Sequence, residues 1–132
     1  MTIKQYQQQS YTNIQSHIDN KDEVLNWSIG LGEEVGEVFN HIKHFYWGKE
    51  NIDKISISKE IGDVLWYLAA LSTSLNLDLQ TIAMINIKKL EHRYKNKFTD
   101  KQSQLRHLKD IEFTKTEEYK NLLKNLTYEK EQ

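Results

Sequence analysis

Hydrophobic residues recur at three- and four-residue steps along much of the chain, a spacing typical of amphipathic helices. The two clearest stripes lie over about residues 23–46 and from Ser56 or Ser58 to Asn76. A polar segment over residues 48–55 separates them, and such a short loop favours antiparallel packing of the two helices. The apolar positions of the stripes are Leu31, Val35, Val38, Ile42 and Phe45 in the first, and Ile57, Ile61, Val64, Leu68, Leu71 and Leu75 in the second.

Weaker patterns predict three more helices. A glutamine-rich segment over about 2–19 has sparse apolar positions, so we expect a half-exposed helix there. Asp78 is a suitable N-cap for a helix over about 79–97. Thr114 and Glu117 have the spacing of a capping box, which predicts a short helix over about 115–127 after a polar linker.

Composition supports an all-α fold. The chain of 132 residues has no proline and only five glycines, whereas turn-dependent β architectures usually need more of both. We therefore expect one four-helix bundle followed by a C-terminal helical tail. The net charge of −1 favours neither nucleic acid nor an anionic membrane as a partner. No cysteine is present, which excludes thiolate metal sites.

Neither a signal core nor a membrane span is visible in the sequence. The first residues lack an apolar core, and no apolar run approaches the roughly 20 residues that cross a bilayer. These observations predict a cytoplasmic protein.

Two acidic clusters lie within the strong stripes, Glu33-Glu34-Val35-Gly36-Glu37 and Glu60-Ile61-Gly62-Asp63. Helical phase places Glu34 with Glu37, and Glu60 with Asp63, beside the apolar faces. If the two helices pack antiparallel, the clusters can face each other. Solvated carboxylates are the ordinary interpretation of one such cluster, but two on consecutive helices favour a site. A glycine within each cluster suggests close approach of a helix or ligand.

Four carboxylates gathered in one place repel one another strongly. A bound Mg²⁺ or Mn²⁺ removes this repulsion, because hard cations take carboxylate oxygens. Mg²⁺ also keeps waters and bridges to substrate phosphates. The residues therefore predict a divalent metal site for phosphate chemistry.

The same residues resemble the motif pair of the MazG-like, all-α nucleoside triphosphate pyrophosphohydrolases, over about residues 23–98. The resemblance implies a MazG-like four-helix domain over 1–100, with 101–132 as a charged extension. It also implies Mg²⁺-dependent hydrolysis of the α–β phosphoanhydride to a nucleoside monophosphate and pyrophosphate. Glu34, Glu37, Glu60 and Asp63 would bind the metal. Glu33 would be an auxiliary ligand, or would orient or deprotonate the attacking water; it could equally be a surface or subunit contact.

The predicted fourth helix supplies candidate phosphate ligands, Asn86, Lys89 and Arg93, in a segment that also resembles the family. Without the acidic motifs, basic residues near a helix C-terminus more often interact favourably with the helix dipole. Trp27 is the first candidate to stack on the base, although core packing is the commoner role. His41 follows Glu37 by one turn, and we expect an outer or structural role for it and for His44.

The leading hypothesis is a pyrophosphohydrolase that removes non-canonical or surplus nucleotides. Its alternative is a non-catalytic helical module that senses nucleotides or binds a protein. The motif pair does not separate broad enzymes from dedicated dUTPases or dCTP pyrophosphatases. Apolar residues in excess of what one thin bundle covers predict an oligomer; they are Phe39, Tyr46, Trp47, Leu65 and Trp66. The resemblance to the family implies that this oligomer is a homodimer or homotetramer.

Overall fold

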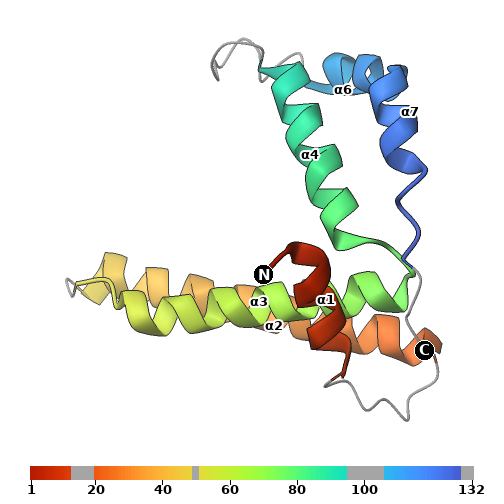
Figure 1. The fold of residues 1–132 in the computed structure, drawn as a ribbon. Helices are drawn as coiled ribbons and strands as arrows, with labels where there is room; N and C mark the ends of the chain where they lie inside the picture. Colours follow the sequence, from red (N-terminus) through yellow and green to blue (C-terminus); the bar gives the residue numbers. More distant parts are fainter. Residues whose placement is uncertain (13–19, 49–50, 95–105, 129–132) are drawn as a thin grey trace. The chain divides into compact units, whose positions relative to one another are not determined.

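The computed structural model describes residues 1–12, 20–48, 51–94 and 106–128. These residues form helices and no strand, so the predicted all-α fold is confirmed. The chain divides into two units, residues 1–75 and 76–132 (Figure 1). The helices are α1 (Ile3–Thr12), α2 (Asn20–Gly48) and α3 (Lys54–Ser74) in the first unit, and α4 (Leu79–Arg93), α6 (Arg106–Thr114) and α7 (Glu117–Leu123) in the second.

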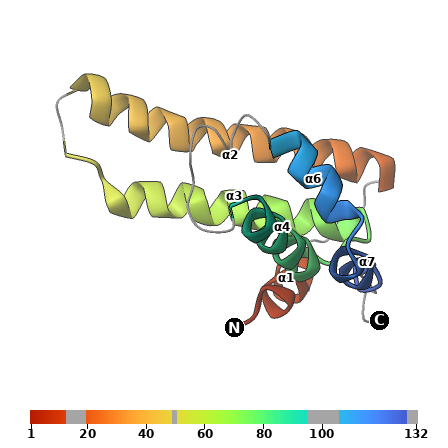
Figure 2. The ribbon, with the colours of Figure 1, turned by 90° about the horizontal axis from the view of Figure 1, so that it is seen from above.

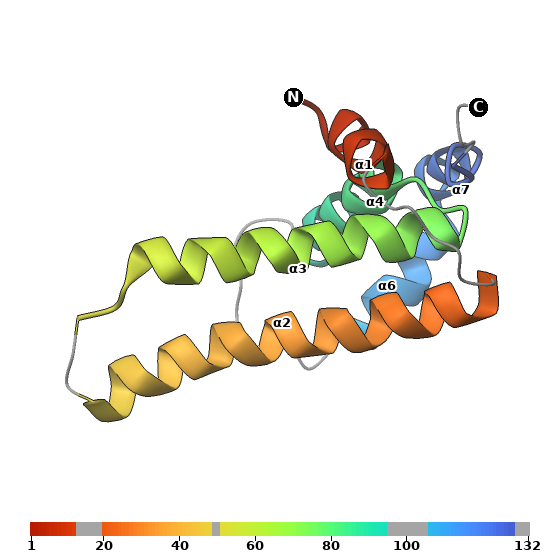
Figure 3. The ribbon, with the colours of Figure 1, turned by 90° about the horizontal axis from the view of Figure 1, so that it is seen from below.

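The first unit is built on a hairpin of two long helices. Helices α2 and α3 run antiparallel and side by side, as predicted from the short loop (Figures 2 and 3). Asp53 caps α3, because its carboxylate accepts hydrogen bonds from the backbone N–H groups of Ile55 and Ser56. The helix thus begins slightly before the predicted Ser56 or Ser58. The register of this hairpin determines which acidic residues meet.

Helix α1 packs across α3 at a stretch of small side chains. Ala69 and Ala70 are completely buried there, which allows close approach of the two helices. The buried amide of Gln7 donates to the Thr73 hydroxyl at 3.1 Å, and that hydroxyl donates to the Ala69 carbonyl. A buried polar group with partners fixes the position of α1 without the cost of an unsatisfied one. Residues 13–19, where the helix was predicted to continue, lie outside the described residues.

The predicted apolar stripes of α2 and α3 are only partly covered in this chain. Val35, Ile42 and Phe45 remain exposed on α2, as do Ile61 and Leu68 on α3. Two helices packed side by side bury one narrow strip of each other, so a wide stripe stays partly in solvent. Such exposed apolar area is unusual for a protein surface that has no partner.

The close approach expected at the glycines occurs at a different position. A Cβ atom added at Gly36 or Gly62 would meet no atom within 4 Å, so neither glycine is required by contact within this chain. Gly30, in contrast, lies directly against the Tyr67 ring of α3. The expectation of close approach inside the acidic clusters was therefore wrong for helix packing. At Gly30 the backbone of α2 approaches a side chain of α3 so closely that a Cβ atom has no room.

The second unit has its own small core. Phe113 of α6 is buried, and its ring lies 5.3 Å from that of Tyr119 and 5.9 Å from that of His92. Asp78 accepts from the Thr81 backbone N–H, which confirms the predicted cap of α4. Helix α6 was not predicted. Because it extends to Thr114, the cap of α7 is Thr116 and not the expected Thr114.

The two ends of this unit are tied together through the backbone. The Tyr128 N–H donates to the Asn76 carbonyl, and the Asp78 N–H donates to the Leu126 carbonyl, both at 2.8 Å. Asn76 adopts a φ of 55°, which asparagine tolerates better than most residues. Residues 124–128, which follow α7, are therefore an integrated part of the unit. None of the helices over the described residues is long and apolar enough to cross a membrane.

Candidate metal centre

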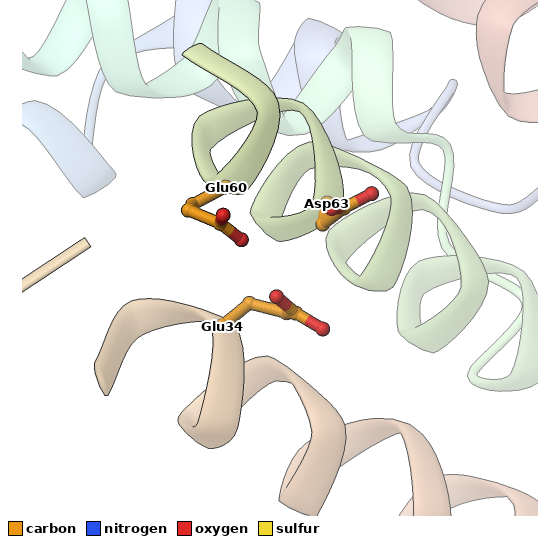
Figure 4. Close-up of side chains that lie close together, drawn as sticks. All are labelled: Glu34, Glu60 and Asp63. Carbon is orange, nitrogen blue, oxygen red and sulfur yellow. The ribbon is translucent and has the colours of Figure 1, made fainter. Parts of the chain in front are cut away.

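Three carboxylates converge between α2 and α3. Glu34 of α2 faces Glu60 and Asp63 of α3 (Figure 4). Each offers one oxygen, and these oxygens all lie within 4.8 Å of one another. Glu34 and Glu60 are half-buried, and Asp63 is exposed. The antiparallel hairpin thus brings together three of the four residues that were predicted to bind metal.

This oxygen set fits a hard divalent cation. Bonds of 2.0–2.1 Å around an octahedral Mg²⁺ separate neighbouring ligand oxygens by about 3.0 Å and opposite ones by about 4.2 Å. The three oxygens lie within 4.8 Å of one another, so their side chains would have to draw together to hold the cation. Three carboxylates leave further positions for water or phosphate oxygens, which is the usual coordination of Mg²⁺ at nucleotide sites.

The other two acids of the first cluster lie outside this group. Glu37 and Glu33 are exposed on α2, and neither is among the three whose oxygens converge. Both still act on the site, because their negative charges help raise the pKa of Glu34. The roles predicted for Glu37 as a ligand and for Glu33 near the attacking water remain predictions.

The pKa of the Glu34 carboxyl is raised by its surroundings. Burial raises its pKa most, followed by the charges of Asp63 and Glu60. A raised pKa means that the folded state holds the proton more tightly than the unfolded state. Ionisation of Glu34 therefore weakens folding at pH values above its folded-state pKa, whereas below its ordinary pKa of 4.5 the penalty disappears.

We accordingly expect Glu34→Gln to raise the melting temperature of the metal-free protein at pH 8. The gain should vanish near pH 3.5, where Glu34 is protonated in both states. Thermal unfolding at the two pH values, in EDTA, measures this difference. A variant that melts below the wild type at pH 8, or that keeps its advantage at pH 3.5, would contradict the raised pKa of Glu34.

Trp27 of α2 is buried against aromatic side chains of α3 and is not open to solvent. Its ring packs edge-on against Trp66, with centroids 5.6 Å apart, and is tilted against Tyr67. Within the described part of the chain its indole N–H has no hydrogen-bond partner. Stacking on a base would require this ring to be uncovered, so the predicted substrate contact of Trp27 stays a prediction.

The three predicted phosphate ligands all lie on α4 of the second unit. Asn86 is exposed, and Lys89 is half-buried without an ion pair among the described residues. Arg93 forms a two-pronged pair with Asp110 of α6, with Nε 3.0 Å from Oδ1 and Nη2 in contact with Oδ2. Asp110 thus accepts from the two parallel N–H donors of Arg93 that a phosphate would use. Phosphate binding by Arg93 would have to displace Asp110.

His41 lies next to the acidic cluster, in a position that the sequence did not specify. Its Nε2 atom lies 3.6 Å from Oε1 of Glu60, across the hairpin. The signal available in the sequence was its spacing of one helical turn from Glu37. His44, a further turn along α2, lines a small cavity together with His41.

The fold and the site define an all-α domain with an acidic, metal-suited cluster between two antiparallel helices. The family model of the MazG nucleotide pyrophosphohydrolase domain matches residues 24–98. The chain belongs to this family, which confirms the resemblance noted in the sequence. The match includes most of α2 and all of α3 and α4, and it ends before α6 and α7.

One curated protein is similar to part of this chain. The Gene 37 protein of Mycobacterium phage L5 is 33% identical over 70 residues. These residues cover 50% of this chain and 61% of the phage protein, which is less than two thirds of its length. No solved structure matches the chain.

Proposed function

We propose that this protein is a Mg²⁺-dependent hydrolase that cleaves nucleoside or deoxynucleoside triphosphates at the α–β phosphoanhydride. The products are a nucleoside monophosphate and pyrophosphate, and the role is removal of unwanted nucleotides. The convergence of Glu34, Glu60 and Asp63 carries the proposal. Membership of the MazG family supports the nucleotide as the substrate.

The protein's own residues have distinct tasks in this mechanism. Glu34, Glu60 and Asp63 would hold the cation, with Glu37, one turn along α2, as a fourth ligand. The bound Mg²⁺ would neutralise phosphate charge and make water more acidic. Glu33, exposed next to Glu34, orients or deprotonates the attacking water. Mn²⁺ is the natural substitute, because it accepts the same oxygen ligands.

The remaining substrate contacts come from the rest of the proposed domain, residues 1–100, with residues 101–132 as an extension. Asn86, Lys89 and Arg93 supply the positive and polar side of the triphosphate site, and Trp27 contacts the base. The Asp110 pair makes Arg93 the contact that most needs a rearrangement. Lys89 has no ion pair to break, because within the described residues no acidic side chain pairs with it.

A substrate panel tests the proposal. Purified protein is incubated with Mg²⁺ and canonical or modified nucleoside triphosphates, and the products are separated by ion-exchange chromatography. We expect monophosphate and pyrophosphate in equal amounts, and none in EDTA. Diphosphate with orthophosphate would show a different bond cleaved. Stoichiometric nucleotide binding without turnover, in Mg²⁺ and in Mn²⁺, would favour the sensing module instead.

We further propose that the chain acts as a homodimer or homotetramer. Phe39, Tyr46 and Trp47 are strongly exposed along one face of α2, and Trp47 is 74% exposed. Together with Gly36 and Ile42 they line a groove of about 520 Å³. A second copy that covers this face would bury apolar surface that this chain leaves in water. Sedimentation should give a mass of at least twice 15.7 kDa, and a monomer at assay concentration would contradict the proposal.

A further inference from the structure

The contact between His41 and Glu60 joins the two helices that carry the metal cluster. His41 lies on α2, one turn beyond Glu37, and its Nε2 atom lies 3.6 Å from Oε1 of Glu60 on α3. Both side chains are largely shielded, with 29% of the His41 side chain and 23% of that of Glu60 exposed. The contact sits on the side of the cluster that faces the α2–α3 loop.

We propose that His41 is a positioning residue, which holds the Glu60 carboxylate in the orientation that binds the divalent cation. This inference rests on the proposed function of the cluster. It assigns to His41 a role of its own that neither the family match nor the phage relative describes.

The physical reason is the freedom of the glutamate side chain. Three rotatable bonds separate its carboxylate from the backbone, and fixing such a long side chain costs conformational entropy. Glu60 is also surrounded by acidic groups that push its carboxylate away from the shared position. An N–H donor on the opposite helix counters both effects, because it attracts one carboxylate oxygen and leaves the other for the cation.

The present separation is slightly longer than a hydrogen bond. A small rotation of either side chain closes it, and contacts of this kind often tighten when the site is engaged. Residues that orient metal ligands in this way typically change metal affinity or activity about 10–100-fold when they are replaced. We therefore expect an effect of that size from His41.

The chain offers a matched control in His44. It is the same residue type on the same helix, and it lines the same cavity as His41, with Phe45, Asn51 and Asp53. It has no ion pair with the acidic cluster among the described residues. A general effect of losing a histidine from this end of α2 would appear in both variants.

The test is Mn²⁺ binding measured by isothermal titration calorimetry on the full chain, without nucleotide. We expect His41→Leu to weaken Mn²⁺ binding about 10–100-fold, with an unchanged helical circular dichroism spectrum. His41→Gln keeps an amide N–H near the position of Nε2, so it should restore affinity to within a few-fold of the wild type. His44→Leu should bind as the wild type does.

Three outcomes overturn the inference. Wild-type affinity in His41→Leu would show that the contact does not position Glu60. An equal loss in His41→Gln and His41→Leu would show that ring shape matters and not the donor. If the wild type binds no Mn²⁺, the proposal that the acidic cluster binds a cation is wrong, and the inference about His41 is wrong as well. The first two results leave the proposed function standing, so the two failures are distinguishable.

Discussion

Asp63→Asn should lower kcat for nucleotide hydrolysis by more than about 100-fold, because it removes a direct ligand and even outer partners are worth 10–100-fold. Asp63 contributes one of three converging oxygens, and an amide in its place offers a neutral, weaker ligand. The variant should fold at least as well as the wild type without metal, since it removes one of the charges that repel Glu34. Steady-state kinetics in saturating Mg²⁺ measure the loss.

Asp22→Asn is the matched control for this experiment. Asp22 is an exposed acid in the first turn of α2, and it lies outside the converging group. The same chemical change there should leave kcat unchanged. If Asp63→Asn keeps the wild-type kcat at saturating Mg²⁺, Asp63 is not a ligand of the metal centre.

Gly30→Ala should destabilise the protein by about 1–2 kcal/mol. A new methyl group would collide with the Tyr67 ring, with Cδ1 of the ring only 2.8 Å away. The ring cannot move freely, because it packs against Trp66 and Trp27. Overpacking of this kind costs about 1–3 kcal/mol, and the better helix propensity of alanine offsets up to about 1 kcal/mol of it. Urea unfolding at one fixed protein concentration measures the change.

Gly32→Ala provides the comparison for Gly30→Ala. An added Cβ at Gly32 meets nothing within 4 Å, so only the gain in helix propensity remains. We expect this variant to be more stable than the wild type by up to about 1 kcal/mol. If both substitutions shift the urea midpoint in the same direction, the packing of α2 on α3 at Gly30 is wrong.

The helices of the first unit could be predicted because their signals are local. The apolar spacing of α2 and α3 and the short loop between them are enough to indicate an antiparallel hairpin. The same spacing places Glu60 and Asp63 on one face. Which acids meet across the hairpin depends on its register, however, and register is a property of two helices together. The structure brings Glu34, Glu60 and Asp63 together, and the role of Glu37 as a fourth ligand stays a prediction.

The second unit shows a different limit. Helix α6 has few apolar residues among many charged ones, and its stability depends on Phe113 being buried against other helices. That burial is a tertiary effect, which a local pattern does not reveal. The partner of Arg93 was hidden for the same reason, because Asp110 is 17 residues away and lies on the helix that was not predicted.

The central claim is that Glu34, Glu60 and Asp63 form the metal centre of a nucleotide pyrophosphohydrolase. A crystal grown with Mn²⁺ and a nucleotide analogue whose α–β bridging oxygen is replaced by nitrogen tests it most directly. Anomalous scattering should place Mn²⁺ between these three carboxylates, with phosphate oxygens completing its coordination. A nucleotide bound elsewhere on the chain, with no Mn²⁺ at the three carboxylates, would contradict the claim.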